Sequence, residues 1–290
     1  MTDGMTGGAG VATPAEQTAT FPEIAGQSSM GGAGIGVADL ATSAEFYMSV
    51  FGMAQRYELA VPNYVDEKML YFPEATSGAD LVLMNYVDGI ERNYKDNPVK
   101  VVFYVPDVTA TIELIRARGL PILTEPAPLP QFNNAIIGFA KDPDGYMLEI
   151  IEAPDSTSGR LGAIGIGVSD LAAAKDFYTR VMGMDVVGDL LQVPGLWDEW
   201  ILNYSGSKGS ALVLMGYTDG KPRNYTNVPV KSVHFVPMVD TTIEQVRSEG
   251  KTVLTEPSPF TVQGVDARIS LARDQDGYTI EVITRSAPAP

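Results

Sequence analysis

The segment "GIGVADLATSAEFYMSVFGM" at residues 34–53 occurs a second time in the chain, as "GIGVSDLAAAKDFYTRVMGM" at residues 165–184. Two shorter segments also repeat: "RNYKDNPVK" (92–100) returns as "RNYTNVPVK" (223–231), and "DPDGYMLEI" (142–150) returns as "DQDGYTIEV" (274–282). The copies lie 131 or 132 residues apart throughout. A constant offset indicates a tandem duplication, and the repeated unit of roughly 125 residues has the ordinary size of one domain. The sequence therefore predicts two similar domains.

Composition limits the class of protein and its partners. The chain is 45% hydrophobic and 19% charged, so each half has enough apolar residues to form a core. Its net charge of -16 opposes binding to a phosphate backbone or to an anionic membrane surface. The absence of cysteine excludes disulfides, thiolate chemistry and Cys-ligated metals. We expect a globular protein that binds neither nucleic acid nor membrane.

The ends of the chain and its centre have the composition of connecting segments. Residues 1–30 are rich in Gly, Ala, Thr and Ser without periodicity, which predicts a disordered arm. Residues 154–159 are interpreted as a linker between the halves, and residues 286–290 as a tail. The arm lacks the basic and apolar regions of a secretory signal, and no apolar run is long enough to cross a bilayer. A cytoplasmic location is expected.

Each half alternates between strand and helix patterns. In the first half a short strand precedes a helix that Asp39 caps, that presents Phe46, Tyr47 and Val50 on one face, and that stops at Gly52. Three strand patterns follow, and the series restarts with a strand at 100–105 and a helix between Asp107 and Gly119. The remaining strand patterns are at 55–61, 67–72, 80–87, 121–126, 134–140 and 146–152. Each half is therefore predicted to hold two βαβββ modules, which gives four modules in the chain.

Two motifs within these modules carry a family resemblance. The first helix ends in "FY…V.GM", and the last hairpin and strand read "DPDGYMLEI". With paired βαβββ modules, these motifs resemble the vicinal oxygen chelate superfamily, which includes glyoxalases, bleomycin resistance proteins and extradiol dioxygenases. The resemblance implies an α+β fold in which four βαβββ modules form two glyoxalase-like domains, 31–153 and 160–285, with curled mixed sheets around clefts. It also implies that up to four inward His, Gln or Glu side chains hold one divalent metal.

The residues at the family's ligand positions do not suit a metal. The first-strand position falls on Gly32 and Ala163, the fourth-strand position on Val82 and Val213, and the fifth-strand position on Lys100 and Lys231. The eighth-strand carboxylate alone is kept, as Glu149 and Glu281. A divalent ion needs several N or O ligands at once, and a protonated lysine offers none. We therefore expect no metal and no other cofactor. The lone His234 follows Lys231 by three residues, so alternation places it on the opposite face, beneath a helix or at the surface.

The lysines and glutamates at these positions are the candidate catalytic residues. Lys100 and Glu149 are expected on neighbouring strands facing one space, as are Lys231 and Glu281. One interpretation is a salt bridge that fills the vacated metal position. The other is a proton-transfer pair, in which partial burial lowers the lysine's proton affinity and the glutamate opposes that shift.

Other inward positions predict a cavity for an organic ligand. Strand parity or hairpin position selects glycine, methionine and aromatic residues, a lining that suits an apolar, ring-bearing molecule. A tight barrel seam explains the glycines equally well, and core packing is the alternative for the other residues. The candidate binding residues are Gly34, Gly36, Met84, Tyr86, Gly165, Gly167, Trp197, Trp200, Met215 and Tyr217, with Tyr64, Tyr71 and Tyr204 nearby. The acidic pairs Asp66/Glu67 and Asp198/Glu199 are expected in solvated hairpin tips. Arg92 and Arg223 are expected to pair with acids across the module interface or to bind a ligand carboxylate.

Three functions from different classes remain open. The first is a metal-independent isomerase or lyase that moves a proton next to a carbonyl or enol, with lysine as base or oxyanion stabiliser and glutamate as proton shuttle. The second is a bleomycin-resistance-type protein that sequesters an aromatic compound without metal. The third is a metal-dependent dioxygenase or glyoxalase with unusual ligands. In each case the partner is a small hydrophobic or aromatic molecule. Four modules already suffice for two clefts, so a monomer or a homodimer is compatible with the sequence.

Overall fold

The computed structural model describes residues 27–94, 97–132, 134–262 and 265–285. Most of the expected N-terminal arm, residues 1–26, and the expected tail, residues 286–290, lie outside the described residues. The boundary of the arm at residue 30 was wrong, because strand β1 begins at Ser29. Residues 154–159 connect the halves without helix or strand.

The first half contains the two predicted modules. Module 1 runs β1(Ser29–Gly36), α1(Leu40–Phe51), β2(Ala54–Val61), β3(Val65–Tyr71) and β4(Asp80–Tyr86). Module 2 runs β5(Val99–Val105), α2(Val108–Ala117), β6(Ile122–Leu129), the short helix η1(Pro130–Phe132), β7(Ala135–Lys141) and β8(Met147–Glu152). The predicted helix ends are confirmed at both ends of α1, where the Asp39 side chain accepts a hydrogen bond from the Thr42 amide and Gly52 adopts a left-handed conformation.

The second half repeats this order. Module 3 runs β9(Arg160–Gly167), α3(Leu171–Asp176), the π-helical turn η2(Phe177–Val181), β10(Asp185–Val193), β11(Trp197–Asn203) and β12(Ala211–Tyr217). Module 4 runs β13(Val230–Phe235), α4(Val239–Ser248), β14(Val253–Val262), β15(Val265–Arg273) and β16(Thr279–Arg285). The four βαβββ modules and the α+β class predicted from the sequence are thereby confirmed.

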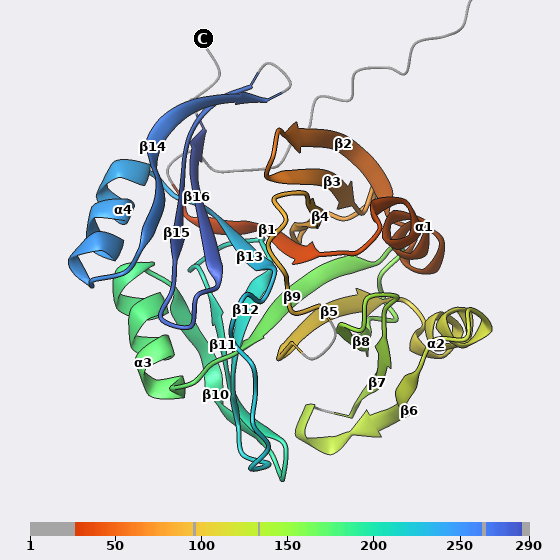
Figure 1. The fold of residues 1–290 in the computed structure, drawn as a ribbon. Coiled ribbons are helices and arrows are strands. Elements are labelled where there is room, and N and C mark those ends of the chain that lie inside the picture. Colours follow the sequence, from red (N-terminus) through yellow and green to blue (C-terminus); the bar gives the residue numbers. More distant parts are fainter. Residues whose placement is uncertain (1–26, 95–96, 133, 263–264, 286–290) are drawn as a thin grey trace, which may run out of the picture.

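Each sheet is shared between the two halves of the chain. One eight-stranded sheet has the order β14-β15-β16-β13-β1-β4-β3-β2 and joins module 4 to module 1. The other has the order β10-β11-β12-β9-β5-β8-β7-β6 and joins module 3 to module 2. The joins are the antiparallel pairs β1–β13 and β5–β9 (Figure 1). The expectation that each half forms its own cleft was therefore incomplete. Each sheet takes strands from both halves.

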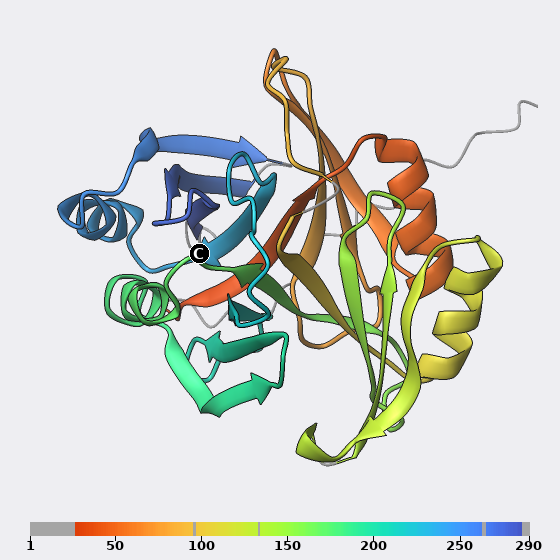
Figure 2. The ribbon, with the colours of Figure 1, turned by 60° about the horizontal axis from the view of Figure 1, so that its bottom comes forward.

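Within each half the modules pack through their helical sides. Helices α1 and α2 lie together on one side of the molecule, and α3 and α4 lie on the other (Figure 2). The main core is formed here, and it includes Ile35, Val37, Ile166 and Val168, which alternate with the inward glycines of β1 and β9. We call the opposite face of each sheet, which carries the lysines, its inner face.

The repeated "DPDG" and "DQDG" motifs tie the two modules of a half together. The Tyr47 hydroxyl on α1 donates to Asp142 at 2.7 Å, and the Tyr178 hydroxyl donates to Asp274 at 2.9 Å. Burial raises the pKa of both carboxyl groups to about 7, although the tyrosine and backbone donors act in the other direction. The family motif is thus a structural link between modules, remote from the inner faces.

Candidate functional site

The predicted lysine and glutamate pairs are brought together on the inner faces. Lys100 on β5 places its Nζ 2.8 Å from Glu149 Oε2 on β8, and Lys231 on β13 places its Nζ 2.8 Å from Glu281 Oε2 on β16. In both cases the two strands are parallel neighbours. The side chains of these four residues are almost entirely buried. The sequence therefore identified both ion pairs correctly.

Each lysine also contacts a second carboxylate that the sequence analysis missed. Lys100 Nζ lies 2.7 Å from Glu199 Oε2 on β11, and Lys231 Nζ lies 2.7 Å from Glu67 Oε1 on β3. The expectation that Glu67 and Glu199 sit in solvated hairpin tips was wrong, because both lie within strands and are buried. Strand alternation could have predicted that both glutamates face inward. Glu67 lies two residues after Val65 on β3, and Glu199 lies two residues after Trp197 on β11, so each pair projects on one face.

These contacts define two equivalent arrangements. We call Lys100, Glu149 and Glu199 the Lys100 site, and Lys231, Glu281 and Glu67 the Lys231 site. Glu199 comes from the second half and joins two residues of the first, whereas Glu67 comes from the first half and joins two residues of the second. Neither site is complete within one half of the duplication.

The inward glycines make room for the lysine side chains, not for a ligand. Gly34 is paired with Lys231, and Gly165 with Lys100. A Cβ atom at either glycine would overlap the aliphatic stem of the paired lysine. Gly36 and Gly167 are similarly filled, by Pro229 and Pro98 of the opposite half. Of the two explanations for these glycines, the structure favours the tight seam over ligand space, because the close approach is made by side chains of the opposite half.

The ion pairs keep both lysines protonated. Burial alone lowers the pKa of Lys100, but the charges of Glu149 and Glu199 outweigh it, and the net shift is upward. The same balance raises the pKa of Lys231, with Glu281 and Glu67 as the opposing charges. An ammonium group whose pKa is raised does not accept a proton near neutral pH. The role of lysine as a base is therefore not supported, whereas a role as hydrogen-bond donor to an oxyanion is retained.

Some of the residues expected to line a cavity lie on the inner faces. Met84, Tyr86, Met215, Tyr217 and Trp197 lie in small apolar clusters on the inner faces, separate from the main core. Tyr64 joins this set through an edge-to-face contact with Tyr86, with ring centroids 5.7 Å apart.

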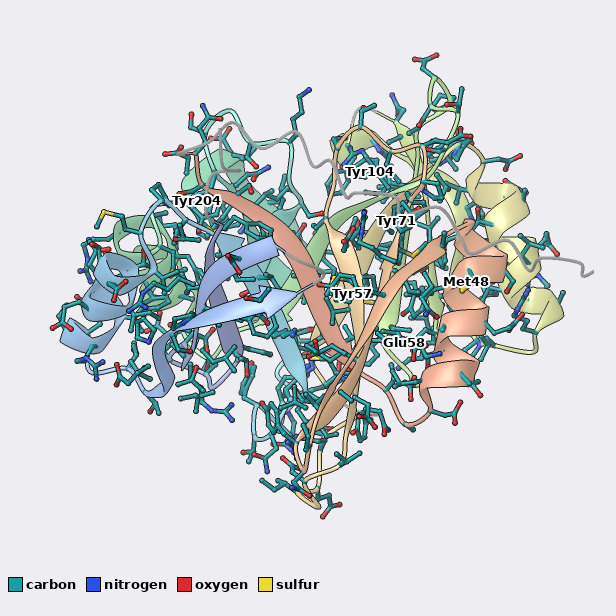
Figure 3. All side chains as sticks on the ribbon, turned by 90° about the horizontal axis from the view of Figure 1, so that it is seen from above. Met48, Tyr57, Glu58, Tyr71, Tyr104 and Tyr204 are labelled. Carbon is teal, nitrogen blue, oxygen red and sulfur yellow. The ribbon has the colours of Figure 1, made fainter. Side chains whose placement is uncertain are left out.

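Trp200 and Tyr204 were assigned to the wrong face. Trp200 packs against the main core with Lys175 over its ring, and Tyr204 lies in that core. Trp200 is three residues after the inward Trp197, so the alternation of a strand places it on the opposite side of the sheet. Figure 3 shows Tyr204 well separated from Tyr57 and Tyr71 of module 1.

His234 occupies the helix-facing side, as predicted. The residue is fully buried, its Nδ1 is 2.9 Å from the Tyr204 hydroxyl, and its Nε2 is 2.8 Å from Ser232 Oγ. Burial lowers its pKa to about 3. His234 is therefore a neutral, hydrogen-bonded core residue.

The two "RNY" segments meet each other. The Asn93 amide donates to the Asn227 carbonyl at 3.1 Å, and its side chain donates to the Asn224 carbonyl at 3.1 Å. Arg92 pairs locally with Asp88 at 2.6 Å, and Arg223 pairs with Asp219 at 2.9 Å. Neither arginine bridges the module interface as one expectation held. The duplicated segment instead places a proline and a lysine of each half against the first-strand glycines of the other half.

The residues at the family's metal position do not fit a divalent ion. Val82 and Val213 are buried in the apolar clusters, and a lysine ammonium lies between the two carboxylates of each site. In the described part of the chain no group of three or more His, Cys, Asp or Glu side chains is arranged to hold a metal. The cation that the carboxylates face is provided by the chain itself.

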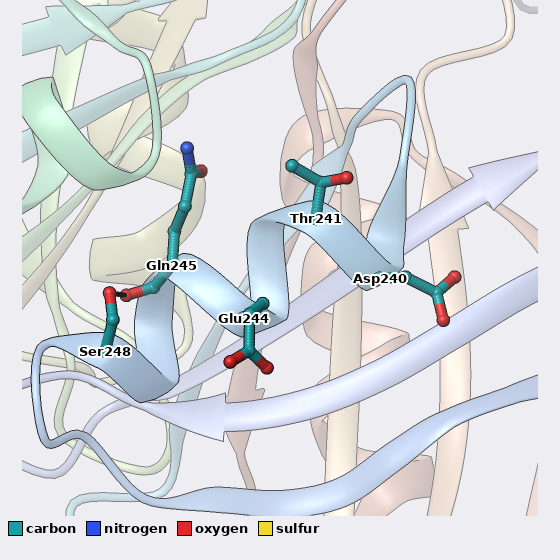
Figure 4. Close-up of a pocket in the computed structure, with 5 residues that line it drawn as sticks. All are labelled: Asp240, Thr241, Glu244, Gln245 and Ser248. Carbon is teal, nitrogen blue, oxygen red and sulfur yellow. Dashed lines mark hydrogen bonds between the residues drawn. The ribbon is translucent and has the colours of Figure 1, made fainter.

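A surface depression lies elsewhere, over helix α4. It is lined by Asp240, Thr241, Glu244, Gln245 and Ser248, and the Ser248 hydroxyl donates to the Gln245 carbonyl at 2.7 Å (Figure 4). Because α4 covers the helical side of its sheet, this depression is not part of either lysine site. No helix among the described residues is both long and apolar enough to cross a membrane.

Comparisons with known proteins agree with this fold. A plant relative, the probable chloroplastic lactoylglutathione lyase of Arabidopsis thaliana, is 25% identical over 250 residues, which cover 83% of this chain and 69% of that protein. Lactoylglutathione lyase GLX1 of the same plant is 30% identical over 155 residues, 51% of this chain and 52% of its own length. The crystal structure of a mutant of glyoxalase I from Zea mays superposes with a TM-score of 0.72 at 26% identity, covering 89% of this chain and 92% of that one.

These relatives are named as lyases, which supports the expectation of an enzyme of the lyase or isomerase class. The model of the Glyoxalase/Bleomycin resistance protein/Dioxygenase superfamily matches residues 29–150 and 160–282, nearly all of both halves. The chain therefore belongs to the glyoxalase/bleomycin resistance protein/dioxygenase superfamily.

Proposed function

We propose that this protein is a metal-independent isomerase or lyase that transfers a proton next to a carbonyl or enol group of a hydrophobic, ring-bearing substrate. The observation that carries the proposal is the lysine ammonium held between two carboxylates at the family's metal position. The ammonium supplies a fixed positive charge beside two groups that accept protons. Enolisation uses a base and a stabilised oxyanion, and this combination supplies both kinds of group.

The roles of the residues follow from their hydrogen-bonding capacity. A lysine ammonium has three N–H donors, and the two carboxylates of its site account for two of them. The third donor is available to a substrate oxygen. Glu281, or Glu149 in the other site, takes the proton from the carbon next to the carbonyl, and the electron pair of the C–H bond moves to the oxygen. The lysine stabilises the resulting enolate. In a β,γ-unsaturated carbonyl substrate the glutamic acid returns the proton to the γ carbon, the C=C bond shifts to the α,β position and the C=O bond re-forms, so the isomerisation needs no oxidant.

The charge of the site selects a neutral substrate. One ammonium and two carboxylates give each site a formal charge of minus one, which repels a carboxylate or phosphate brought into contact with it. Tyrosine and methionine side chains surround the ion pairs on the inner face. A neutral carbonyl compound with an aromatic or other apolar ring matches both properties.

Sequestration without chemistry is the second candidate function. The observation in its favour is that both lysines are already ion-paired and that the inward glycines are filled. A site of this kind can hold a ring-bearing ligand against the tyrosines without reacting with it. We do not assign the substrate of the lactoylglutathione lyases to this chain, because the residues at the metal position differ in kind from metal ligands.

Exchange of carbon-bound hydrogen tests the proposed function. Phenylacetone, a neutral aromatic ketone, is incubated in D₂O with the full chain after dialysis against a chelator, and loss of its benzylic proton signal is followed by NMR. We expect exchange above the buffer rate, and a reduction of about 100-fold or more for Glu281→Gln combined with Glu149→Gln. Glu244→Gln, on the exposed face of α4, is the control. An exchange rate in the double variant equal to that of the parent chain, or no exchange with the parent chain, contradicts the proposal.

A further inference from the structure

The two lysine sites occupy the same positions in their sheets but differ in their neighbours. In the first sheet, cross-strand pairing aligns Tyr57, Met69, Val82, Gly34 and Lys231 in one row. In the second sheet the corresponding row is Val187, Ile201, Val213, Gly165 and Lys100. Directly paired residues project on the same face of a sheet. The row of the Lys231 site therefore ends in a tyrosine where the row of the Lys100 site ends in a valine.

Trp197 covers the Lys100 site. Its indole Nε1 donates to Glu199 Oε2 at 2.7 Å, the oxygen that also accepts from Lys100, and the lysine Nζ lies 5.3 Å from the centre of the indole. The corresponding residue beside the Lys231 site is Val65, which pairs with Tyr86 as Trp197 pairs with Tyr217. Valine has neither the size nor the donor to cover the ion pairs in this way.

The exposure of the charged side chains follows this difference. In the Lys100 site the side chains of Lys100, Glu149 and Glu199 are 2%, 6% and 3% exposed. Their counterparts Lys231, Glu281 and Glu67 are 9%, 12% and 8% exposed. Every member of the Lys231 site is thus more accessible than its equivalent. The Lys231 site is therefore the more accessible of the two to a molecule in solution.

Tyr57 adds a donor to the accessible site. Its side chain is partly buried, and within the described part of the chain its hydroxyl has no hydrogen-bond partner. Burial raises the pKa of Tyr57 to about 12, and Glu281, Lys231 and Glu67 are close enough to influence it. The phenol is therefore protonated at neutral pH. Figure 3 shows it near the middle of the molecule, over the strands of module 1.

We infer that the Lys231 site is the one that binds ligand, with Tyr57 as a second donor, and that the Lys100 site is a closed structural counterpart. The ligand class is a neutral aromatic enol or enolisable ketone whose oxygen accepts from Lys231 Nζ and from the Tyr57 hydroxyl. Tyr64 and Tyr86, in edge-to-face contact, provide the surface for its ring. This inference rests on the proposed function for the chemistry but not for the binding.

Stoichiometry of binding tests the inference without requiring turnover. The probe is 2-naphthol, a neutral aromatic analogue of an enol, titrated into the full chain by calorimetry. We expect one 2-naphthol per chain. Two equivalent molecules per chain, or no binding at millimolar probe, overturns the inference.

Matched variants locate the bound probe. Val65→Trp introduces the covering residue of the other site, and we expect it to weaken binding by about ten-fold or more; Val65→Phe serves if the tryptophan variant does not fold. Tyr57→Phe removes one hydrogen bond, and we expect about three- to ten-fold weaker binding. Val187→Ala changes the matching position of the Lys100 row and leaves the affinity unchanged. If Val187→Ala loses binding while Val65→Trp and Val65→Phe keep the affinity of the parent chain, the probe binds at the Lys100 site and the inference is overturned.

Failure of the inference and failure of the proposed function are separable. If 2-naphthol binds at the Lys231 site but phenylacetone does not exchange, the site assignment stands and the protein sequesters its ligand. If exchange proceeds unchanged in Val65→Trp, Val65→Phe and Tyr57→Phe, the chemistry stands and the site assignment is wrong.

Discussion

The Lys100 and Lys231 sites have the same three charged groups and the same strand pairing, yet they differ in access. Trp197 shields the first, whereas the smaller Val65 leaves the second more exposed. Because each site takes residues from both halves, a change in either half affects both sites. The duplication thus gives two sites of one plan, of which we propose that one holds the halves together while its counterpart binds a ligand.

Removal of the lysine charge is the change with the largest expected effect. Lys100→Met leaves Glu149 and Glu199 buried without a partner, so we expect the free energy of unfolding to fall by about 3–5 kcal/mol. Lys231→Met is expected to cost less, because its carboxylates are more exposed. Urea denaturation gives both values, with the exposed Lys221→Met as control. Equal losses at the two sites would remove the distinction between them.

Replacement of the covering indole has the next largest effect. Trp197→Phe removes the hydrogen bond to Glu199, and we expect a loss of about 1–3 kcal/mol in unfolding free energy. Leu196→Ala, at the exposed neighbouring residue, is the control. Thermal unfolding measures the loss, and a phenylalanine variant as stable as the parent chain shows that the indole does not hold the site closed.

The buried carboxyl groups of Asp142 and Asp274, which link the two modules of each half, predict the same pH dependence of stability in both halves. Their pKa rises from the ordinary 3.8 to about 7 on folding, so the folded chain binds protons more tightly between these values. Their stabilising contribution is therefore present below about pH 4 and is lost as the pH rises to 7, by up to about 1.4 kcal/mol per pH unit for each group. Asp142→Asn with Asp274→Asn should flatten the slope seen in denaturant titrations. A contribution that increases with pH through this window contradicts the assignment.

Loss of the Tyr57 hydroxyl is expected to have the smallest effect on stability. With no hydrogen-bond partner in the described residues, Tyr57→Phe should change the free energy of unfolding by less than about 0.5 kcal/mol. A larger loss in denaturation experiments indicates that the hydroxyl has a structural role, and Tyr47→Phe, which breaks the bond to buried Asp142, is the positive control.

The sequence predicted the repeat, the modules and the lysine–glutamate pairs, because helix caps, alternation and family motifs are local signals. It did not predict that β5 pairs with β9 and β1 with β13, since strand pairing across halves is decided by tertiary contacts. Glu67 and Glu199 were missed for a simpler reason: the acidic dipeptides were assigned to turns, although alternation from Val65 and Trp197 directs the glutamates inward. The prediction that Trp200 faces inward failed for the same reason, because three residues after Trp197 a strand side chain projects on the opposite face.

Native mass spectrometry of the full chain, recorded with and without 2-naphthol, tests the central claim most directly. We predict a metal-free mass that gains one 2-naphthol per chain, because lysine ammonium groups occupy the metal position and the Lys231 site is the ligand site that we propose. A divalent ion bound at each site, or two molecules of 2-naphthol per chain, would contradict this account.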